Sequence, residues 1–217
     1  MFLGHFAAAY AAKKMQPKVS LGTYFFAAQW LDLLWPLLLL TGSERVLIDP
    51  GNSASTPLHF VEYPISHSLL AVAGWALLIG ILFYLLTRNG KASFLIAALV
   101  LSHWFLDLLV HVPDLPLSPF SDTKAGLGLW NFKYPWLIAE IIIFLIPVYL
   151  YMRDTRPLNK TGSIASLLLI VFLLVIQVMN AFSPPPPSVN AIAVMGLSQW
   201  LLIAWAYWSD RNRRIVK

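Results

Sequence analysis

Residues 95–112 read LIAALVLSHWFLDLLVHV, an apolar run that carries His103, Asp107 and His111 at intervals of four residues. An aspartate near the centre of a bilayer costs about 2.5–3.5 kcal/mol, so one without a partner is not expected to persist. On a helix that rises about 1.5 Å per residue, these side chains share one face at spacings of about 6 Å. The stretch therefore predicts a membrane helix whose polar face converges on a common partner, such as an ion.

The composition is that of a membrane protein. Hydrophobic residues make up 59% of the 217-residue chain, charged residues make up 12%, and the mean hydropathy is +0.70. Such values lie outside the usual range of soluble domains. The chain contains no cysteine, which excludes disulfides, thiolate metal sites and cysteine nucleophiles.

Five other apolar stretches accompany the first, each close to the roughly 20 residues that a spanning helix needs. The predicted spans cover residues 21–40, 66–86, 92–111, 134–151, 164–182 and 191–208. Residues 1–12 are too short to cross a bilayer, and we expect them to form a retained half-helix. The prediction is an all-α integral membrane protein with six transmembrane helices plus this half-helix. We expect one membrane domain, 1–217, in which 1–114 carry the metal site and 133–217 support it.

Basic residues predict the orientation of the bundle, because short loops rich in Lys and Arg stay in the cytoplasm. Twelve of the fifteen Lys and Arg residues fall on one side if six helices alternate, and that side includes the C-terminus. The C-terminus is therefore expected to be cytoplasmic. The net charge of +5 reflects this topology together with attraction to membrane lipids, and no nucleic-acid partner is expected.

Helical rise predicts how deep the buried acids lie. Asp32 and His103 each come eleven residues after the start of a span, roughly 17 Å above the cytoplasmic face, and Asp107 lies near 22 Å. Glu140, on a helix that runs the opposite way, comes out at about 20 Å. Acids on three helices are therefore expected to share one layer in the outer half of the bundle.

Two histidines outside these helices extend the set. His5 reaches a depth of about 12 Å if residues 1–12 enter the membrane from the cytoplasmic side. His67 begins its span, so we expect it near the outer surface. Imidazoles and carboxylates are ligands of Zn²⁺ and, with more oxygen, of Mn²⁺ or Fe²⁺. The predicted ligands are His5, Asp32, His67, His103 and Asp107, with Glu140 as a ligand or general base and His111 as a supporting or proton-transfer group.

Other functions fit the same residues. Buried acids on several helices are also typical of a small proton- or cation-coupled transporter, although the sequence shows no evident inverted repeat. Histidines on separate helices can hold haem in a non-catalytic binding protein, but the neighbouring acids favour a harder metal. Polar groups that only join helices by hydrogen bonds are a further alternative.

The order of these residues resembles that of a known family. Four elements carry the resemblance: Gly4-His5, a lone Asp32, Ser66-His67-Ser68-Leu69-Leu70, and Ser102-His103-Trp104-Phe105-Leu106-Asp107. They are similar to the motifs of membrane-bound metal-dependent hydrolases described as LexA-binding, inner membrane-associated hydrolases. The chain departs from the family pattern at Tyr63-Pro64-Ile65, where the family often has His-Arg-Gly. The resemblance covers about residues 1–114 and implies a bacterial inner-membrane location, a divalent metal and hydrolysis.

The ligand order is also similar, more loosely, to that of zinc-dependent phospholipase C. This likeness implies that Asp32, His67, His103 and Asp107 surround one metal, and that Asp107 bridges toward a second ion near His5. The reaction implied is hydrolysis by a metal-activated water, on a phosphoester or lipid-linked substrate. Membrane lipids are the expected partners, and the sequence leaves the oligomeric state open.

Overall fold

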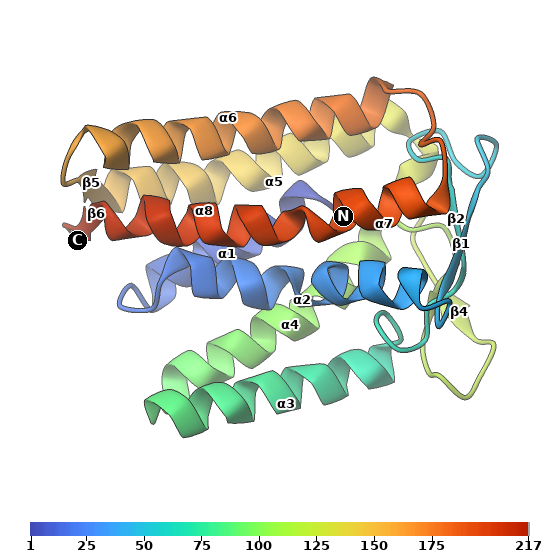
Figure 1. Cartoon of the computed structure of the whole chain (residues 1–217), viewed down its shortest axis with the longest axis horizontal. Coiled ribbons are helices and arrows are strands. Elements are labelled where there is room, and N and C mark those ends of the chain that lie inside the picture. Colours follow the sequence, from blue (N-terminus) through green and yellow to red (C-terminus); the bar gives the residue numbers. More distant parts are fainter. Residues whose placement is uncertain (217) are drawn as a thin grey trace.

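Six helices in the computed structural model, which describes residues 1–216, are long and apolar enough to cross a membrane. They are α2 (Leu21–Leu40), α3 (Leu69–Thr87), α4 (Gly90–Val110), α5 (Lys133–Asp154), α6 (Lys160–Phe182), and α7 (Val189–Leu197) with α8 (Gln199–Arg211), which share one span. They run along the length of the molecule (Figure 1). The prediction of a helical membrane bundle with six spans is confirmed.

Polar side chains set where several of these helices begin. The caps that accept a hydrogen bond from a backbone N–H in the first turn are Ser20, Ser68, Asn89, Asn159 and Ser188. Such caps satisfy donors that have no partner within the helix. Because Ser68 caps α3, His67 lies in the turn before that helix and not inside a span that begins at residue 66, as the apolar pattern predicted.

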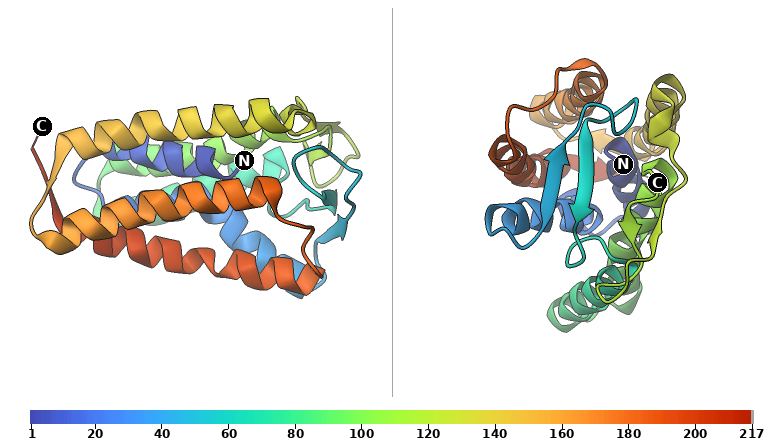
Figure 2. Two further views of the ribbon diagram at one scale, coloured as in Figure 1. Left: turned by 90° about the horizontal axis from the view of Figure 1, so that it is seen from above. Right: turned by 90° about the vertical axis from the view of Figure 1, so that its right-hand side faces the viewer.

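The predicted half-helix is α1 (Leu3–Met15), whose 13 residues are too few to cross a bilayer. It packs against α5, α2 and α4, and an end-on view shows it surrounded by the longer helices (Figure 2). Glu140 holds its start by accepting a hydrogen bond from the Leu3 backbone N–H at 2.6 Å. Lys13, near its end, pairs with Asp210 at 2.8 Å. An acid at the first turn and a base at the last turn both suit the helix dipole.

Short strands close the two ends of the bundle. In the described part of the chain the antiparallel pairs are β1 (Arg45–Ile48) with β2 (Leu58–Glu62), β3 (Leu115–Pro116) with β4 (Lys124–Ala125), and β5 (Thr155–Pro157) with β6 (Arg213–Ile215). A 3-10 turn, η1 (Leu129–Asn131), follows β4. The β1–β2 hairpin lies at one end of the molecule and the β5–β6 pair at the other (Figure 1). None of these strands was predicted, since each spans at most five residues.

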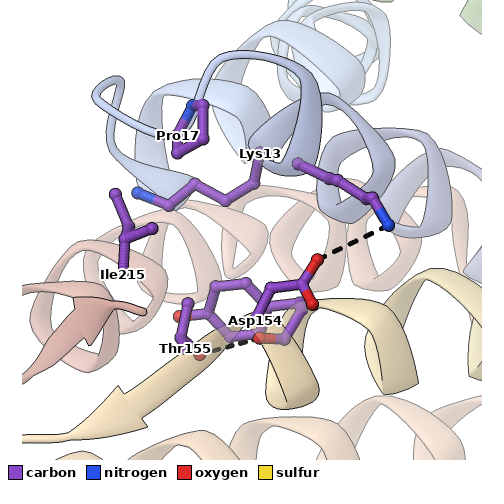
Figure 3. A pocket seen from close by; sticks show the side chains of 7 residues that line it. Lys13, Pro17, Asp154, Thr155 and Ile215 are labelled. Carbon is purple, nitrogen blue, oxygen red and sulfur yellow. Dashed lines mark hydrogen bonds and ion pairs between the residues drawn. The ribbon is translucent and has the colours of Figure 1, made fainter. Parts of the chain in front are cut away.

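A small cavity lies at the β5–β6 end (Figure 3). Lys14 pairs with Asp154 there at 3.5 Å, and the Thr155 hydroxyl donates to the Tyr151 backbone oxygen at 2.7 Å. Its volume of about 20 Å³ is room for roughly one water molecule, whereas ligand pockets start at about 300 Å³. This cavity is therefore too small for a ligand of ordinary size.

Candidate metal centre

His103 lies at the centre of a polar cluster on the inner face of α4. Its ring is buried, and its Nδ1 atom lies 2.7 Å from the backbone oxygen of Ala28 on α2. Because a carbonyl oxygen only accepts hydrogen bonds, Nδ1 carries the hydrogen and Nε2 of the neutral ring presents a lone pair. Among residues 1–216 this Nε2 atom has no hydrogen-bond partner, and it faces Asp107 Oδ2 at 3.2 Å and Asp32 Oδ1 at 3.7 Å.

His67 approaches the same two carboxylates from the turn before α3. Its Nε2 atom lies 3.6 Å from Asp32 Oδ1 and 3.8 Å from Asp107 Oδ2. Each of the two histidine Nε2 atoms therefore lies within 3.8 Å of an oxygen of both aspartates. Ligand atoms bound about 2.1 Å from a tetrahedral zinc ion stand about 3.4 Å apart. The four nitrogen–oxygen distances, which run from 3.2 to 3.8 Å, fit that spacing.

The charges of this cluster also favour a cation between the ligands. Asp32 and Asp107 bring two carboxylates to these imidazoles, and within residues 1–216 the amino group of Met1 pairs with Asp107 alone. A cation beside Asp32 would balance the second carboxylate. Asp32, His67 and His103 form one group of ligand atoms within 4.8 Å of one another. Each of these residues comes from a different segment of the chain, α2, the turn before α3, and α4.

His5 forms a second group with His103 and Asp107, again with ligand atoms within 4.8 Å of one another. Its Nε2 atom lies 3.1 Å from Asp107 Oδ1, and its ring stacks on the His103 ring at 3.5 Å between centroids. The amino group of Met1 pairs with the same Asp107 oxygen. This cationic group lies where the loose likeness to phospholipase C implied that Asp107 would bridge toward a second ion.

Glu140 lies outside both groups. Its Oε1 atom accepts a hydrogen bond from Trp136 Nε1 at 2.5 Å, and its Oε2 atom accepts one from the Leu3 backbone at 2.6 Å. These contacts make Glu140 a cap for α1. The role of ligand or general base stays a prediction for this residue. Helical rise predicted the depth of the Glu140 side chain, but it does not predict which neighbour the side chain faces.

His111 follows the end of α4, one turn beyond Asp107, and also lies outside both groups. Its Nδ1 atom lies 2.8 Å from Asp114 Oδ1, and the Tyr63 hydroxyl donates to the same oxygen at 3.1 Å. Its ring packs on Trp130 at 4.1 Å between centroids. Burial lowers the pKa of His111 and raises the pKa of the Tyr63 hydroxyl well above its ordinary value. The lowered pKa favours the uncharged form of this imidazole at neutral pH.

Sequence reasoning missed the groups that hold the ligand rings in place. The Ala28 acceptor is a backbone oxygen, so no residue type indicates it. Ser66 and Glu44, which hold His67, are 22 residues apart, and only the fold brings them together.

The sequence profile of the YdjM inner membrane protein family matches residues 3–183. This range runs from α1 to the end of α6 and includes every predicted metal ligand. No curated protein and no solved structure matches the chain.

Proposed function

Because the chain belongs to the YdjM inner membrane protein family and holds imidazoles and carboxylates at metal-ligand spacing, we propose that it is a metal-dependent membrane hydrolase. The observation that carries the proposal is the set of distances from 3.2 to 3.8 Å between two histidines and two aspartates. Zn²⁺ suits this ligand set, and Mn²⁺ or Fe²⁺ also bind such ligands. The ion would supply a water activated for attack on a phosphoester.

The protein's own residues then control access and proton transfer. The Asp32 side chain is 26% exposed, whereas that of Asp107 is 3% exposed, so a substrate reaches the site beside Asp32. His111, uncharged and oriented by Asp114, is the residue that exchanges a proton with the substrate or water. Trp130 and Tyr63 pack on its ring and limit the approach of solvent.

An open apolar groove beside the site supports a lipid-linked substrate. Its volume is about 380 Å³, within the range of ligand sites. The groove is lined by Pro64, Ile65, Ala71, Gly74, Trp75, Leu78 and Pro119. The Trp75 indole donates to the Ile65 backbone oxygen at 2.9 Å and so joins α3 to the segment that carries His67. A hydrocarbon tail in this groove brings its phosphoester headgroup toward His67.

The distribution of charge supports one orientation of the proposed enzyme. The β5–β6 end carries Arg156, Arg213 and Arg214, and the predicted ligands lie in the half of the bundle nearer the β1–β2 hairpin. Since positive loops stay in the cytoplasm, the C-terminus is cytoplasmic and the site opens toward the other side of the inner membrane.

Removal of metal tests the proposed reaction. Treatment of the purified protein with a chelator should abolish hydrolysis of phosphomonoester and phosphodiester lipids in detergent micelles, because no activated water remains. Addition of Zn²⁺, Mn²⁺ or Fe²⁺ should restore the rate. Protein that binds metal stoichiometrically and turns over neither class of lipid would contradict the hydrolase and assign a binding role instead.

Gly74→Leu tests the lipid groove separately. A Cβ atom at residue 74 meets no other atom within 4 Å, so the larger side chain fits without disturbing the fold and fills the groove instead. Loss of burial for about two CH₂ groups should lower kcat/KM about tenfold on long-chain substrates. Hydrolysis of a short-chain, water-soluble phosphoester is the control and should keep its rate. An equal fall in kcat/KM for the long-chain and short-chain substrates would contradict binding of a hydrocarbon tail in this groove.

A further inference from the structure

Glu44 is a buried acid that belongs to neither ligand group. It lies between α2 and β1, is 1% exposed, and forms no ion pair within residues 1–216. Its Oε1 atom accepts hydrogen bonds from the backbone N–H groups of Ile65 and Ser66, both at 2.8 Å. Its Oε2 atom accepts a hydrogen bond from the Ser66 hydroxyl at 2.6 Å. Burial of a carboxylate is costly, and these contacts explain how the fold tolerates it.

The Ser66 hydroxyl connects this acid to His67. Because the Ser66 hydroxyl donates to Glu44 Oε2, its single hydrogen points to that acid. The Ser66 oxygen lies 2.7 Å from His67 Nδ1 and can only accept there. When the His67 ring carries a single hydrogen, that hydrogen is therefore on Nδ1, and the lone pair is on Nε2, the atom that faces Asp32 and Asp107.

We propose that Glu44 and Ser66 are positioning residues that fix His67 in the tautomer able to bind metal through Nε2. The inference rests on the proposed metal site and names the residues that set its ligand chemistry. His103 obtains the same tautomer from the Ala28 backbone oxygen. His67 instead contacts the Ser66 hydroxyl, which can either donate or accept a hydrogen bond. Glu44 fixes this hydroxyl as an acceptor toward His67, because it takes the hydroxyl hydrogen itself.

The variant Glu44→Gln reverses the hydrogen-bond chain while keeping the shape of the side chain. The amide oxygen still accepts from the two backbone N–H groups, and the amide NH₂, in place of Oε2, donates to the Ser66 oxygen. The Ser66 hydrogen must then point to His67 Nδ1, and the ring hydrogen moves to Nε2. Zn²⁺ affinity, measured by competition with a chelating dye, should fall toward the upper end of the 10–100-fold range typical of such partners.

Ser66→Ala separates this effect from support of the backbone. This variant removes the hydrogen bond between Glu44 and His67 through residue 66 but does not reverse its direction. The loss of Zn²⁺ affinity should therefore be near tenfold, at the lower end of the same range. In the Ser66→Ala background, Glu44→Gln should cause no further loss of Zn²⁺ affinity, because no hydroxyl then connects residue 44 to the His67 ring. A further loss of Zn²⁺ affinity in that background would overturn the proposal that Glu44 acts on His67 through Ser66, and it would leave Glu44 a purely structural residue. Glu62→Gln, at an acid that is 61% exposed, is the matched control.

The tautomer itself is measurable without metal. Nitrogen-15 NMR of the metal-free protein, with His67 assigned by comparison with His67→Ala, should show the hydrogen on Nδ1 in the wild type and on Nε2 in Glu44→Gln. The same tautomer in both proteins would overturn the proposal. If Glu44→Gln does not fold, Ser66→Ala decides the question by its loss of a single fixed tautomer. A wild type that shows the predicted tautomer but binds no Zn²⁺ would refute the metal site and not the action of Glu44 on His67 through Ser66.

Discussion

His103→Ala is expected to abolish metal binding. The Nε2 atom of His103 faces both Asp107 and Asp32, and this residue belongs to both groups of candidate ligands. Loss of a ligand should exceed the roughly 10–100-fold cost of losing a partner outside the coordination sphere. The lost hydrogen bond to Ala28 costs only about 0.5–1.5 kcal/mol, so the variant should remain folded.

Metal content per chain, measured by mass spectrometry after purification, checks this prediction together with titration of Zn²⁺. His59→Ala is the matched control, because His59 lies in β2, is half-buried, and belongs to neither ligand group. Its metal content should equal that of the wild type. Unchanged Zn²⁺ affinity in His103→Ala, or an equal loss in His59→Ala, would contradict the assignment of the ligands.

Asp107→Ala is expected to destabilise the metal-free protein by about 3–5 kcal/mol, the usual cost of breaking a buried ion pair. Asp107 pairs with the amino group of Met1 and contacts His5 at 3.1 Å and His103 at 3.2 Å. Its removal therefore leaves the amino group of Met1 buried without a counter-ion. The variant should lose metal and fold stability together.

Asp32→Ala provides the comparison, because its carboxylate faces the same histidines but is 26% exposed. We expect this variant to lose metal while the free energy of unfolding of the metal-free protein changes by less than about 1 kcal/mol. Chemical unfolding of both variants in the same detergent, with chelator present, measures the difference. Equal stabilities would show that Asp107 does not have the structural role that its contacts indicate.

The spans were predictable because long apolar runs are local features of the sequence. The first predicted span, residues 21–40, coincides with α2, and the others differ by a few residues at their ends. Side-chain caps set the start of three of them, at Ser68, Asn89 and Asn159. The β1–β2 hairpin was not predictable in the same way. Its strands have four and five residues, and the segment between them contains Gly51 and Pro57, which are typical of a loop.

The candidate site was predictable where its geometry is local. His103 and Asp107 are four residues apart on one helix, and this spacing alone places them on one face. Depth estimates brought Asp32 into the same layer, and the structure places it beside His103. They placed Glu140 there as well, but that side chain turns toward α1. Contacts such as that of Glu44 with Ser66 depend on a turn after α2 that no local pattern indicates.

The metal content of the wild-type protein, purified without chelator and then dialysed against Zn²⁺, tests the central claim most directly. The ligand geometry predicts at least one tightly bound divalent ion per chain, with histidine nitrogen and carboxylate oxygen in its X-ray absorption spectrum. Protein that remains metal-free after this treatment, while folded and monodisperse, would contradict the metal centre and with it the proposed hydrolase.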